Sequence, residues 1–304
     1  MSRTRRMIEE LRTELGEQSP LPDPVAPVAP IEPPPVRVNP RAPLKDARFA
    51  AQAAEHTTAL VGVGRVGTRY ATEVVLQFQA ELAVAHGAVG AVLPDDWAEQ
   101  QGLVFLSTRV ASHREFLLRP DLGRRLHPES ATRWEAECAK DIDIQPILAD
   151  GLSAVACMGA GPELLAHFIG QCEGRGLRVG TPVVSRFSRV WLQDEIGQIA
   201  RAKVACILLG ERPGLGTGDG LSAYMVYDPK VGRTDGERNM ISNIHARGIV
   251  PADAAERLAR LAGGMLDQKT SGVDLDLSKI PGLGGAGGTA LREPQVRKRL
   301  VSIP

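Results

Sequence analysis

Glu211 stands where a short apolar run, Lys203 to Leu209, gives way to a loop rich in glycine, Gly210 to Gly220. Branched apolar residues dominate the run, which predicts a buried strand, and open α/β sheets bind ligands just beyond the carboxyl ends of such strands. A carboxylate at that place can accept hydrogen bonds from a bound molecule. The same residues also allow a tight turn without a ligand, in which Glu211 pairs with Arg212 or Arg189.

A second candidate for chemistry is a G-x-G-x-x-G match formed by Gly62, Gly64 and Gly67. Such a match indicates dinucleotide binding when it joins a strand to a helix and an acidic residue follows about 20 residues later. A helical pattern does follow, but Glu81, at that distance, lies inside the pattern and not at the end of a second strand. An NAD-dependent oxidoreductase that uses these glycines is therefore our alternative hypothesis, and we favour a match without a nucleotide.

Metal and nucleophile chemistry have little support in the sequence. The six histidines form no H-x-x-x-H pair and no G-x-S-x-G elbow is present. The four cysteines are widely spaced, which fits a reducing compartment: Cys138, Cys157, Cys172 and Cys206. We predict neither a metal site nor a catalytic residue in this chain.

One histidine does lie in a suggestive pattern, because the segment Asn243 to Gly248 nearly matches D-x-H-x-x-G around His245. In that pattern the histidine replaces the lower axial base of cobalamin, and the aspartate orients the imidazole. Here Asn243 stands in place of the aspartate, and an amide does this less well, so the pattern alone is a weak indication.

Composition and charge exclude several partners. The 304 residues carry 36 basic and 36 acidic side chains, so no net charge draws the chain to nucleic acid or to an anionic membrane. No apolar stretch reaches the roughly 18 residues of a membrane span, and the amino terminus lacks the apolar core of a signal peptide. We expect a cytoplasmic protein that binds neither nucleic acid nor membranes.

The amino-terminal part is predicted as a helix on a tether. Residues 1–19 place Met7, Ile8 and Leu11 on one face of an amphipathic helix, and residues 20–45 form a proline-rich linker. A helix of this length is marginal in water unless it docks, so the arrangement suggests a targeting tag. A disordered tail without a specific role is the competing interpretation.

Residues 46–138 are predicted as a small helical domain. It contains a dense polar turn with three arginines, Arg119, Arg124 and Arg125. These guanidinium groups could hold the carboxylates or phosphates of a partner, although such a cluster more often forms an internal network of salt bridges.

Residues 139–274 change to a rhythm of strand, loop and helix. This rhythm predicts an α/β fold, with a Rossmann-like, doubly wound, mostly parallel sheet. The loops 150–153 and 210–220 should meet at one edge of that sheet and favour a binding crevice. The expected strands are 142–149, 177–184, a short one at 189–192, 203–209 and 223–227, followed by a helix over 252–269. Residues 275–304 are predicted as a flexible, glycine-rich tail.

Seven strings, in this order and spacing, resemble the small subunit of adenosylcobalamin-dependent ethanolamine ammonia-lyase. The resemblance covers roughly residues 64–272, and is specific because unrelated sheets would not share all these loops. The strings are Arg119-Pro-Asp-Leu-Gly-Arg-Arg-Leu126, Asp150-Gly-Leu-Ser153, Gly180-Thr-Pro182, Arg189-Val190 with Asp194-Glu195-Ile196-Gly197, Gly210-Glu-Arg-Pro-Gly-Leu-Gly216, Ile241-Ser-Asn-Ile-His245 and Gln268-Lys-Thr-Ser-Gly272.

The resemblance implies a cofactor-clamping subunit. The family enzyme converts ethanolamine to acetaldehyde and ammonia through a radical formed from adenosylcobalamin. A large TIM-barrel subunit holds the substrate, and cobalamin lies between the two kinds of subunit. It also implies an assembly of several such pairs and, from residues 1–19, a possible location inside a bacterial microcompartment. Because radical chemistry belongs to the cofactor, this chain would bind and position it.

Carried over by position, the cobalamin contacts fall on Val190, Glu211 and Met240. Glu211 would accept hydrogen bonds from amide groups of the cofactor, and Val190 would offer backbone and apolar surface. Met240 stands where another member of the family has Cys, so a backbone contact would survive the difference better than a sulfur contact. The family keeps the cofactor's own base as lower ligand, so His245 is expected to be structural or to face the partner.

Overall fold

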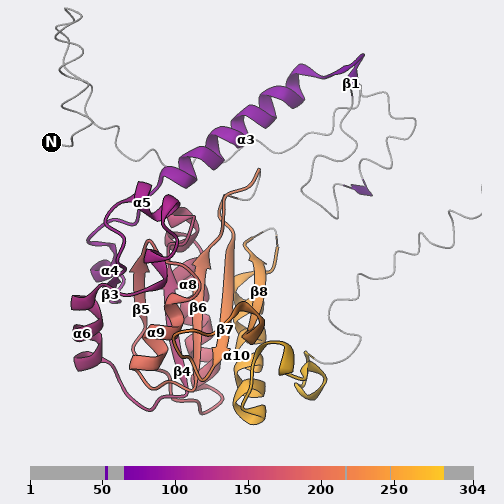
Figure 1. Ribbon diagram of the computed structural model, residues 1–304. Helices are drawn as coiled ribbons and strands as arrows, with labels where there is room; N and C mark the ends of the chain where they lie inside the picture. The colour runs from indigo at the N-terminus through magenta and orange to yellow at the C-terminus, as the bar shows by residue number, and fades with distance from the viewer. Residues whose placement is uncertain (1–51, 54–64, 216–217, 247, 284–304) are drawn as a thin grey trace, which may run out of the picture. The chain divides into compact units, whose positions relative to one another are not determined.

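The computed structural model describes residues 52–53, 65–215, 218–246 and 248–283 (Figure 1). The predicted helix 1–19, the linker 20–45 and residues 284–304 of the predicted tail lie outside the described residues. None of the helices in the described part is long and apolar enough to cross a membrane.

A six-stranded, mostly parallel sheet forms the centre of the fold (Figure 1). Its first four strands in spatial order are parallel, and its last two are antiparallel to their neighbours. In spatial order the strands are β3 (Val104–Ser107), β5 (Val183–Arg186), β4 (Ile144–Ala149), β6 (Val204–Gly210), β7 (Leu221–Tyr227) and β8 (Arg238–Ile244). The predicted α/β class with a mostly parallel sheet is confirmed.

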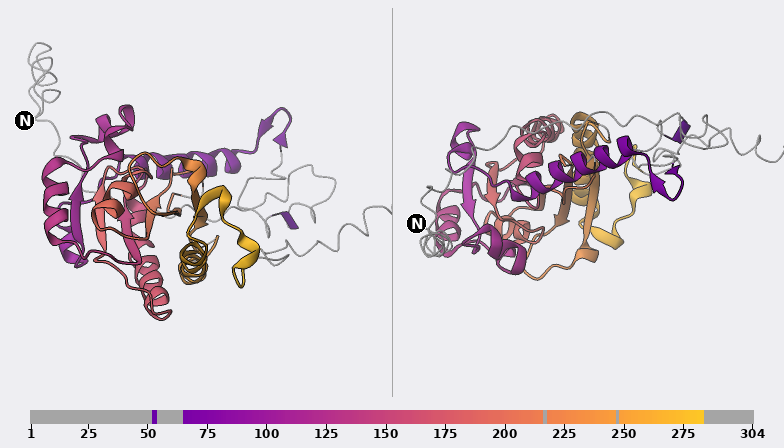
Figure 2. Two further views of the ribbon diagram at one scale, coloured as in Figure 1. Left: turned by 60° about the horizontal axis from the view of Figure 1, so that its bottom comes forward. Right: turned by 90° about the horizontal axis from the view of Figure 1, so that it is seen from above.

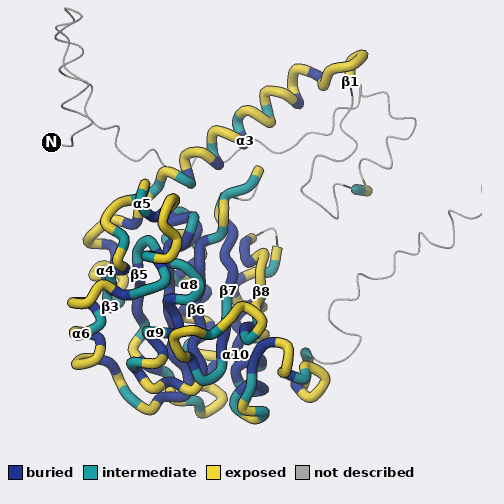
Figure 3. Tube along the Cα trace, in the orientation of Figure 1, coloured by how far each residue is buried: buried dark blue, intermediate teal, exposed yellow. Residues whose placement is uncertain are grey.

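Helices cover both faces of this sheet, as the turned views show (Figure 2). On one face α7 (Ala154–Met158), α8 (Gly161–Glu173) and α10 (Pro251–Gln268) enclose one apolar core. On the other, α6 (Pro128–Glu137) and α9 (Leu192–Ile199) enclose a second core. The central strands β4 and β6 are buried along their whole length (Figure 3), because both of their faces are covered.

The direction of winding changes at β4. The chain passes from β4 to its neighbour β5 through α7 and α8 on one face, then crosses to β6 on the other side of β4 through α9 on the opposite face. The carboxyl ends of β4 and β6 therefore meet at a topological switch point, the usual place for a ligand in such sheets.

Residues 46–138 differ from the all-helical domain expected for them. They do contain α3 (Thr72–Gly90), α4 (Trp97–Gln100), α5 (His113–Leu118) and α6, but β3 pairs with β5 and so extends the main sheet. Trp134 of α6 is fully buried, and its indole N–H donates to the backbone oxygen of Ile196 in α9 at 3.1 Å. The four residues of β3 are too few for a pattern of alternation to distinguish a strand from a helix.

Two further predictions need correction. Residues 189–192 do not form a strand, because a turn at 190–191 leads directly into α9 at Leu192. The start of the predicted flexible tail is packed, because Leu275 and Ile280 are buried in the α10 core. The remaining short elements are β1 (Arg65–Val66), β2 (Arg69–Tyr70), and 3-10 turns at Leu122–Arg124, Asp235–Glu237, Gly272–Asp274 and Leu277–Lys279.

Candidate functional site

The two loops expected to converge at the switch point do so and interlock. The backbone N–H of Leu152 donates to the oxygen of Gly210 at 2.9 Å, and the hydroxyl of Ser153 donates to the oxygen of Gly218 at 3.0 Å. Gly151 has φ of 53°, and a Cβ there would lie 2.2 Å from the oxygen of Gly210. Backbone therefore fills the space directly above β4 and β6.

Glu211, the first residue after β6, is joined to β7. Its Oε1 accepts a hydrogen bond from the hydroxyl of Tyr224 at 2.9 Å. Burial first, and the charge of Glu211 second, raise the pKa of Tyr224 to about 12, so the tyrosine is the donor. Among the described contacts, Glu211 forms no salt bridge with Arg212 or Arg189, the two partners that the sequence allowed.

Met240 lies beside this pair on β8. It is the cross-strand neighbour of Tyr224, and half of its surface is exposed. Strand alternation places Glu211 on the same face as Leu209, whose side chain belongs to the core under α9, and Tyr224 packs against that core too. The sheet thus brings Glu211, Tyr224 and Met240 together on its α9 face.

Val190 lies in the segment that leads into α9 and packs against the same core. Its neighbour Trp191 donates its indole N–H to a carboxylate oxygen of Asp235 at 2.6 Å. On the other side, the backbone N–H of Arg189 donates to the oxygen of Gly123 at 2.9 Å. Val190 is therefore held at the start of the helix that covers the face carrying Glu211 and Met240.

Asp150, which follows β4 directly, holds the same segment in place through two hydrogen bonds. Its two carboxylate oxygens accept the backbone N–H groups of Phe187 at 2.9 Å and Ser188 at 3.2 Å. Burial raises the pKa of Asp150 to about 7, against the opposing effect of these amide donors.

Buried polar groups flank Val190 without partners among the described residues. They are the hydroxyls of Ser185 and Ser188 and both amide atoms of Gln193. Buried polar atoms nearly always have a hydrogen-bond partner, so such a group indicates a bound molecule or a water. They lie around the segment that carries Val190, whereas Glu211 offers a half-buried carboxylate that can accept from an amide donor.

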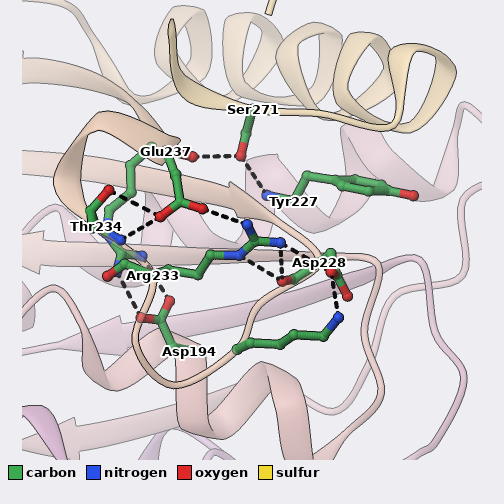
Figure 4. A network of polar contacts seen from close by, with 9 residues as sticks. Asp194, Tyr227, Asp228, Arg233, Thr234, Glu237 and Ser271 are labelled. Carbon is green, nitrogen blue, oxygen red and sulfur yellow. Dashed lines mark hydrogen bonds and ion pairs between the residues drawn. The ribbon is translucent and has the colours of Figure 1, made fainter. Parts of the chain in front are cut away.

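The loop between β7 and β8 is held by a network of ions (Figure 4). Arg233 contacts the carboxylates of Asp228 and Glu237, and Glu237 also accepts from the backbone N–H of Thr234 at 2.7 Å. These contacts, the Thr234 backbone first, lower the pKa of Glu237 to about 2. The network holds the loop that supplies Asp235 to Trp191.

A buried ion pair ties β8 to α9 just below. Two guanidinium nitrogens of Arg238 donate to the two carboxylate oxygens of Asp194, each at 2.7 Å, and each side chain is only 2% exposed. Because one partner is on the strand that carries Met240 and the other on the helix that follows Val190, the pair fixes these two parts of the site together.

His245 is part of the structure around β8. It is 4% exposed, and its Nε2 lies 2.6 Å from the amide oxygen of Asn243. In the described residues, no cluster of three or more histidine, cysteine, aspartate or glutamate side chains is arranged to hold a metal ion. Its burial and its contact with Asn243 favour the structural role expected for His245.

The dinucleotide hypothesis does not fit the part of its motif that is described. Gly67, with φ of 61°, lies in the tight turn between β1 and β2, which pair antiparallel, and does not open a helix. Gly62 and Gly64 lie outside the described residues.

Sequence reasoning missed Tyr224, because a tyrosine in the middle of a strand resembles any core residue. Only the strand register shows that it lies between Glu211 and Met240.

Comparison with known families shows the family to which the chain belongs. The family model described as ethanolamine ammonia-lyase light chain (EutC) matches residues 48–276, which is most of the chain and includes Val190, Glu211 and Met240. The chain therefore belongs to the ethanolamine ammonia-lyase light-chain family, whose members are subunits of that lyase.

Proposed function

We propose that this chain, together with the large subunit of ethanolamine ammonia-lyase, binds adenosylcobalamin and positions it between the two subunits. The observation that carries the proposal is the meeting of Glu211, Tyr224 and Met240 on the sheet face whose covering helix begins beside Val190. When bound, the cofactor supplies the radical that starts the conversion of ethanolamine to acetaldehyde and ammonia. The residues of this chain bind and orient, and none of them is assigned a catalytic step.

Each residue has a role suited to an amide-rich cofactor. The hydroxyl of Tyr224 donates to Oε1 of Glu211, and none of the described hydrogen bonds involves Oε2. In our proposal, Oε2 is the atom that accepts a hydrogen bond from a cofactor amide. Met240, half exposed on β8, supplies apolar and polarizable contact, and Val190 supplies apolar surface and backbone. Tyr224 acts on the cofactor only through Glu211 and is a positioning residue.

The partner in this proposal is the large catalytic subunit, with several such pairs in the complete enzyme. Helix α3 supports an interaction surface, because Val75, Phe78 and Leu82 are all exposed on it at helical spacing. The role of residues 1–19 as a tag for a microcompartment is a separate proposal that rests on the sequence pattern alone.

The test is a titration of the complex of both subunits with cobalamin, followed by its absorption spectrum. We expect Glu211→Gln to weaken binding by about threefold to thirtyfold, because a charge-assisted hydrogen bond becomes a neutral one. Glu173→Gln, which changes an exposed carboxylate at the end of α8 on the other face, is the matched control and should bind like the wild type. Tyr224→Phe should have a smaller effect than Glu211→Gln. Equal affinities of the wild type, Glu211→Gln and Met240→Ala would refute the proposed site.

A further inference from the structure

The segment that follows β5 begins with a strained backbone. Phe187, its first residue, has φ of 58° although it is not a glycine. A bulky residue with a positive φ is strained, and such strain persists only where the surrounding structure holds it, most often near functional sites. The segment continues to Val190, the expected cofactor contact. The contacts that hold Phe187 in this conformation therefore also help to fix the position of Val190.

Two side chains bind both peptide groups that flank Phe187. The carboxylate of Asp150 accepts the backbone N–H groups of Phe187 at 2.9 Å and Ser188 at 3.2 Å. The hydroxyl of Thr108 donates a shared hydrogen bond to the backbone oxygens of Arg186 at 3.1 Å and Phe187 at 3.3 Å. Both N–H groups and both oxygens of the two peptide groups are therefore bound by one carboxylate and one hydroxyl.

The sheet explains how these two side chains reach the same turn. β5 lies between β3 and β4, and both neighbours run parallel to it. Thr108 is the first residue after β3 and Asp150 the first after β4, so both stand at the edge of the sheet where β5 ends. Both are buried. Thr108 thus reaches the site through β3, the strand that the helical prediction for residues 46–138 did not contain.

The neighbouring contacts leave little room for a different path of the chain. The backbone N–H of Arg189 donates to the oxygen of Gly123 at 2.9 Å, and a Cβ at Gly123 would lie 2.7 Å from the oxygen of Phe187. The ring of Phe187 packs against that of Phe116, with 5.7 Å between the ring centroids. The backbone oxygen of Phe187 is thus close to Gly123 as well as bonded to Thr108, and its direction is fixed.

We propose that Thr108 is a positioning residue for the cofactor: together with Asp150 it holds the strained backbone at Phe187, and so presents Val190 to cobalamin. The inference rests on the proposed function, in which Val190 contacts the cofactor and Thr108 does not. Without the hydroxyl, two backbone oxygens lose this donor, and the segment can relax into conformations that place Val190 elsewhere. The apparent affinity for the cofactor then falls with the fraction of molecules that keeps the binding conformation.

The experiment is a titration of the complex of both subunits with cobalamin, followed by its absorption spectrum. Thr108→Val keeps the shape of the side chain but removes the hydroxyl, and should raise the Kd of cobalamin by about threefold to thirtyfold. Thr108→Ser keeps the hydroxyl and should restore most of the affinity. Thr132→Val is the matched control, because it removes an exposed hydroxyl that donates to the backbone oxygen of Pro128 in α6, and should bind like the wild type.

Hydrogen exchange in the complex without cobalamin tests the positioning directly. The amides of Phe187 and Ser188 should exchange faster in Thr108→Val than in the wild type, whereas those of β4 and β6 should not change. In steady-state assays the KM for adenosylcobalamin should rise, while kcat at saturating cofactor and the KM for ethanolamine stay the same. A merely structural role would lower the amount of folded enzyme and leave the Kd and the KM for the cofactor unchanged.

A cobalamin Kd in Thr108→Val equal to that of the wild type would overturn the proposal. An equal loss in Thr108→Val and Thr108→Ser would overturn it too, because the hydroxyl would then not be the cause. If Thr108→Val does not assemble with the large subunit, Asp150→Asn decides at pH 8. Its amide keeps one oxygen as acceptor and turns a donor group towards the second backbone N–H, so an unchanged Kd in this variant would overturn the proposal.

Failure here can be told apart from failure of the proposed function. If Glu211→Gln weakens cobalamin binding and Thr108→Val does not, the cofactor site stands and the positioning role of Thr108 falls. If Glu211→Gln and Met240→Ala also leave the Kd unchanged, both fall together.

Discussion

The pKa of Asp150 leads to a testable prediction, because burial and hydrogen bonding shift it in opposite directions. The side chain is only 3% exposed, and both of its oxygens accept backbone N–H groups of Phe187 and Ser188. Burial raises its pKa to about 7, although these amides favour the charged form. The outcome matters for the site, since Phe187 has φ of 58°, and its strained backbone begins the segment that carries Val190.

The perturbation is Asp150→Asn. In the wild type the folded pKa of about 7 lies above the value of 3.8 expected in the unfolded chain, so the folded state binds this proton more tightly. The contribution of Asp150 to stability is therefore fully present below pH 3.8 and is lost as pH rises to about 7. At 1.36 kcal/mol per pKa unit, the difference of about three units corresponds to roughly 4 kcal/mol. Asn has the same shape and does not titrate.

The assay is urea unfolding of the full-length chain between pH 4 and pH 8, followed by tryptophan fluorescence. Near pH 4 the two proteins should have similar stability, because a protonated carboxyl and an amide are both uncharged and each keeps a carbonyl oxygen that accepts a backbone N–H. As pH rises to 8, Asp150→Asn should become the more stable protein by up to roughly 4 kcal/mol. Asp267→Asn, at an exposed position of α10, is the control for a lost surface charge.

A wild type that gains stability over Asp150→Asn as pH rises would refute this reasoning. That result would mean that the amide donors of Phe187 and Ser188 outweigh burial, and that Asp150 is ionised at neutral pH.

Two further perturbations test the loops around the site. Gly151→Ala should destabilise the chain by about 2 kcal/mol or more, because at this positive φ its Cβ would lie 2.2 Å from the oxygen of Gly210. Gly87→Ala is the control: nothing lies within 4 Å of its Cβ, so it should stabilise α3 by roughly 0.5–1 kcal/mol. The midpoints of urea unfolding measure both effects, and equal effects would contradict the interlocked loops. Glu237→Gln should remove a stabilising contribution that is present above pH 4.5 and is lost as pH falls through about 2. The stabilities of the wild type and of the variant, measured by acid unfolding, should therefore converge at low pH. A constant difference between them would show that the Arg233 network does not depend on this charge.

The buried parts of the sheet could be predicted from the sequence because their patterns are simple. The strand expected at 203–209 is β6 at Val204–Gly210, and the one expected at 142–149 is β4 at Ile144–Ala149. Both are covered on two faces and read as continuous apolar runs. The strand β8 was not predicted, since it lies at the edge of the sheet and carries polar residues such as Arg238, Asn239 and Ser242 on both faces.

The residues of the candidate site also differ in how far the sequence alone could identify them. Glu211 could be selected from the sequence because it follows a buried strand directly, and the structure places it at the switch point. Val190 and Met240 came only from resemblance to a family, because neither spacing nor residue type distinguishes them. The sequence could not show which carboxylates the neighbouring arginines contact; in the structure Arg119 pairs with Asp121, and Arg125 pairs with Glu195.

The interlocked loops explain why this sheet does not use its switch point in the manner of a dinucleotide-binding protein. In those proteins a glycine-rich turn leaves space for a pyrophosphate above the strands, whereas here Gly151 and Gly210 let two backbones approach each other and close that space. Beside this closed space lie the antiparallel strands β7 and β8, which a purely parallel sheet would lack. These two strands supply Tyr224 and Met240. We infer that the added hairpin, and not the switch point alone, makes the face broad enough for a flat, amide-rich ring.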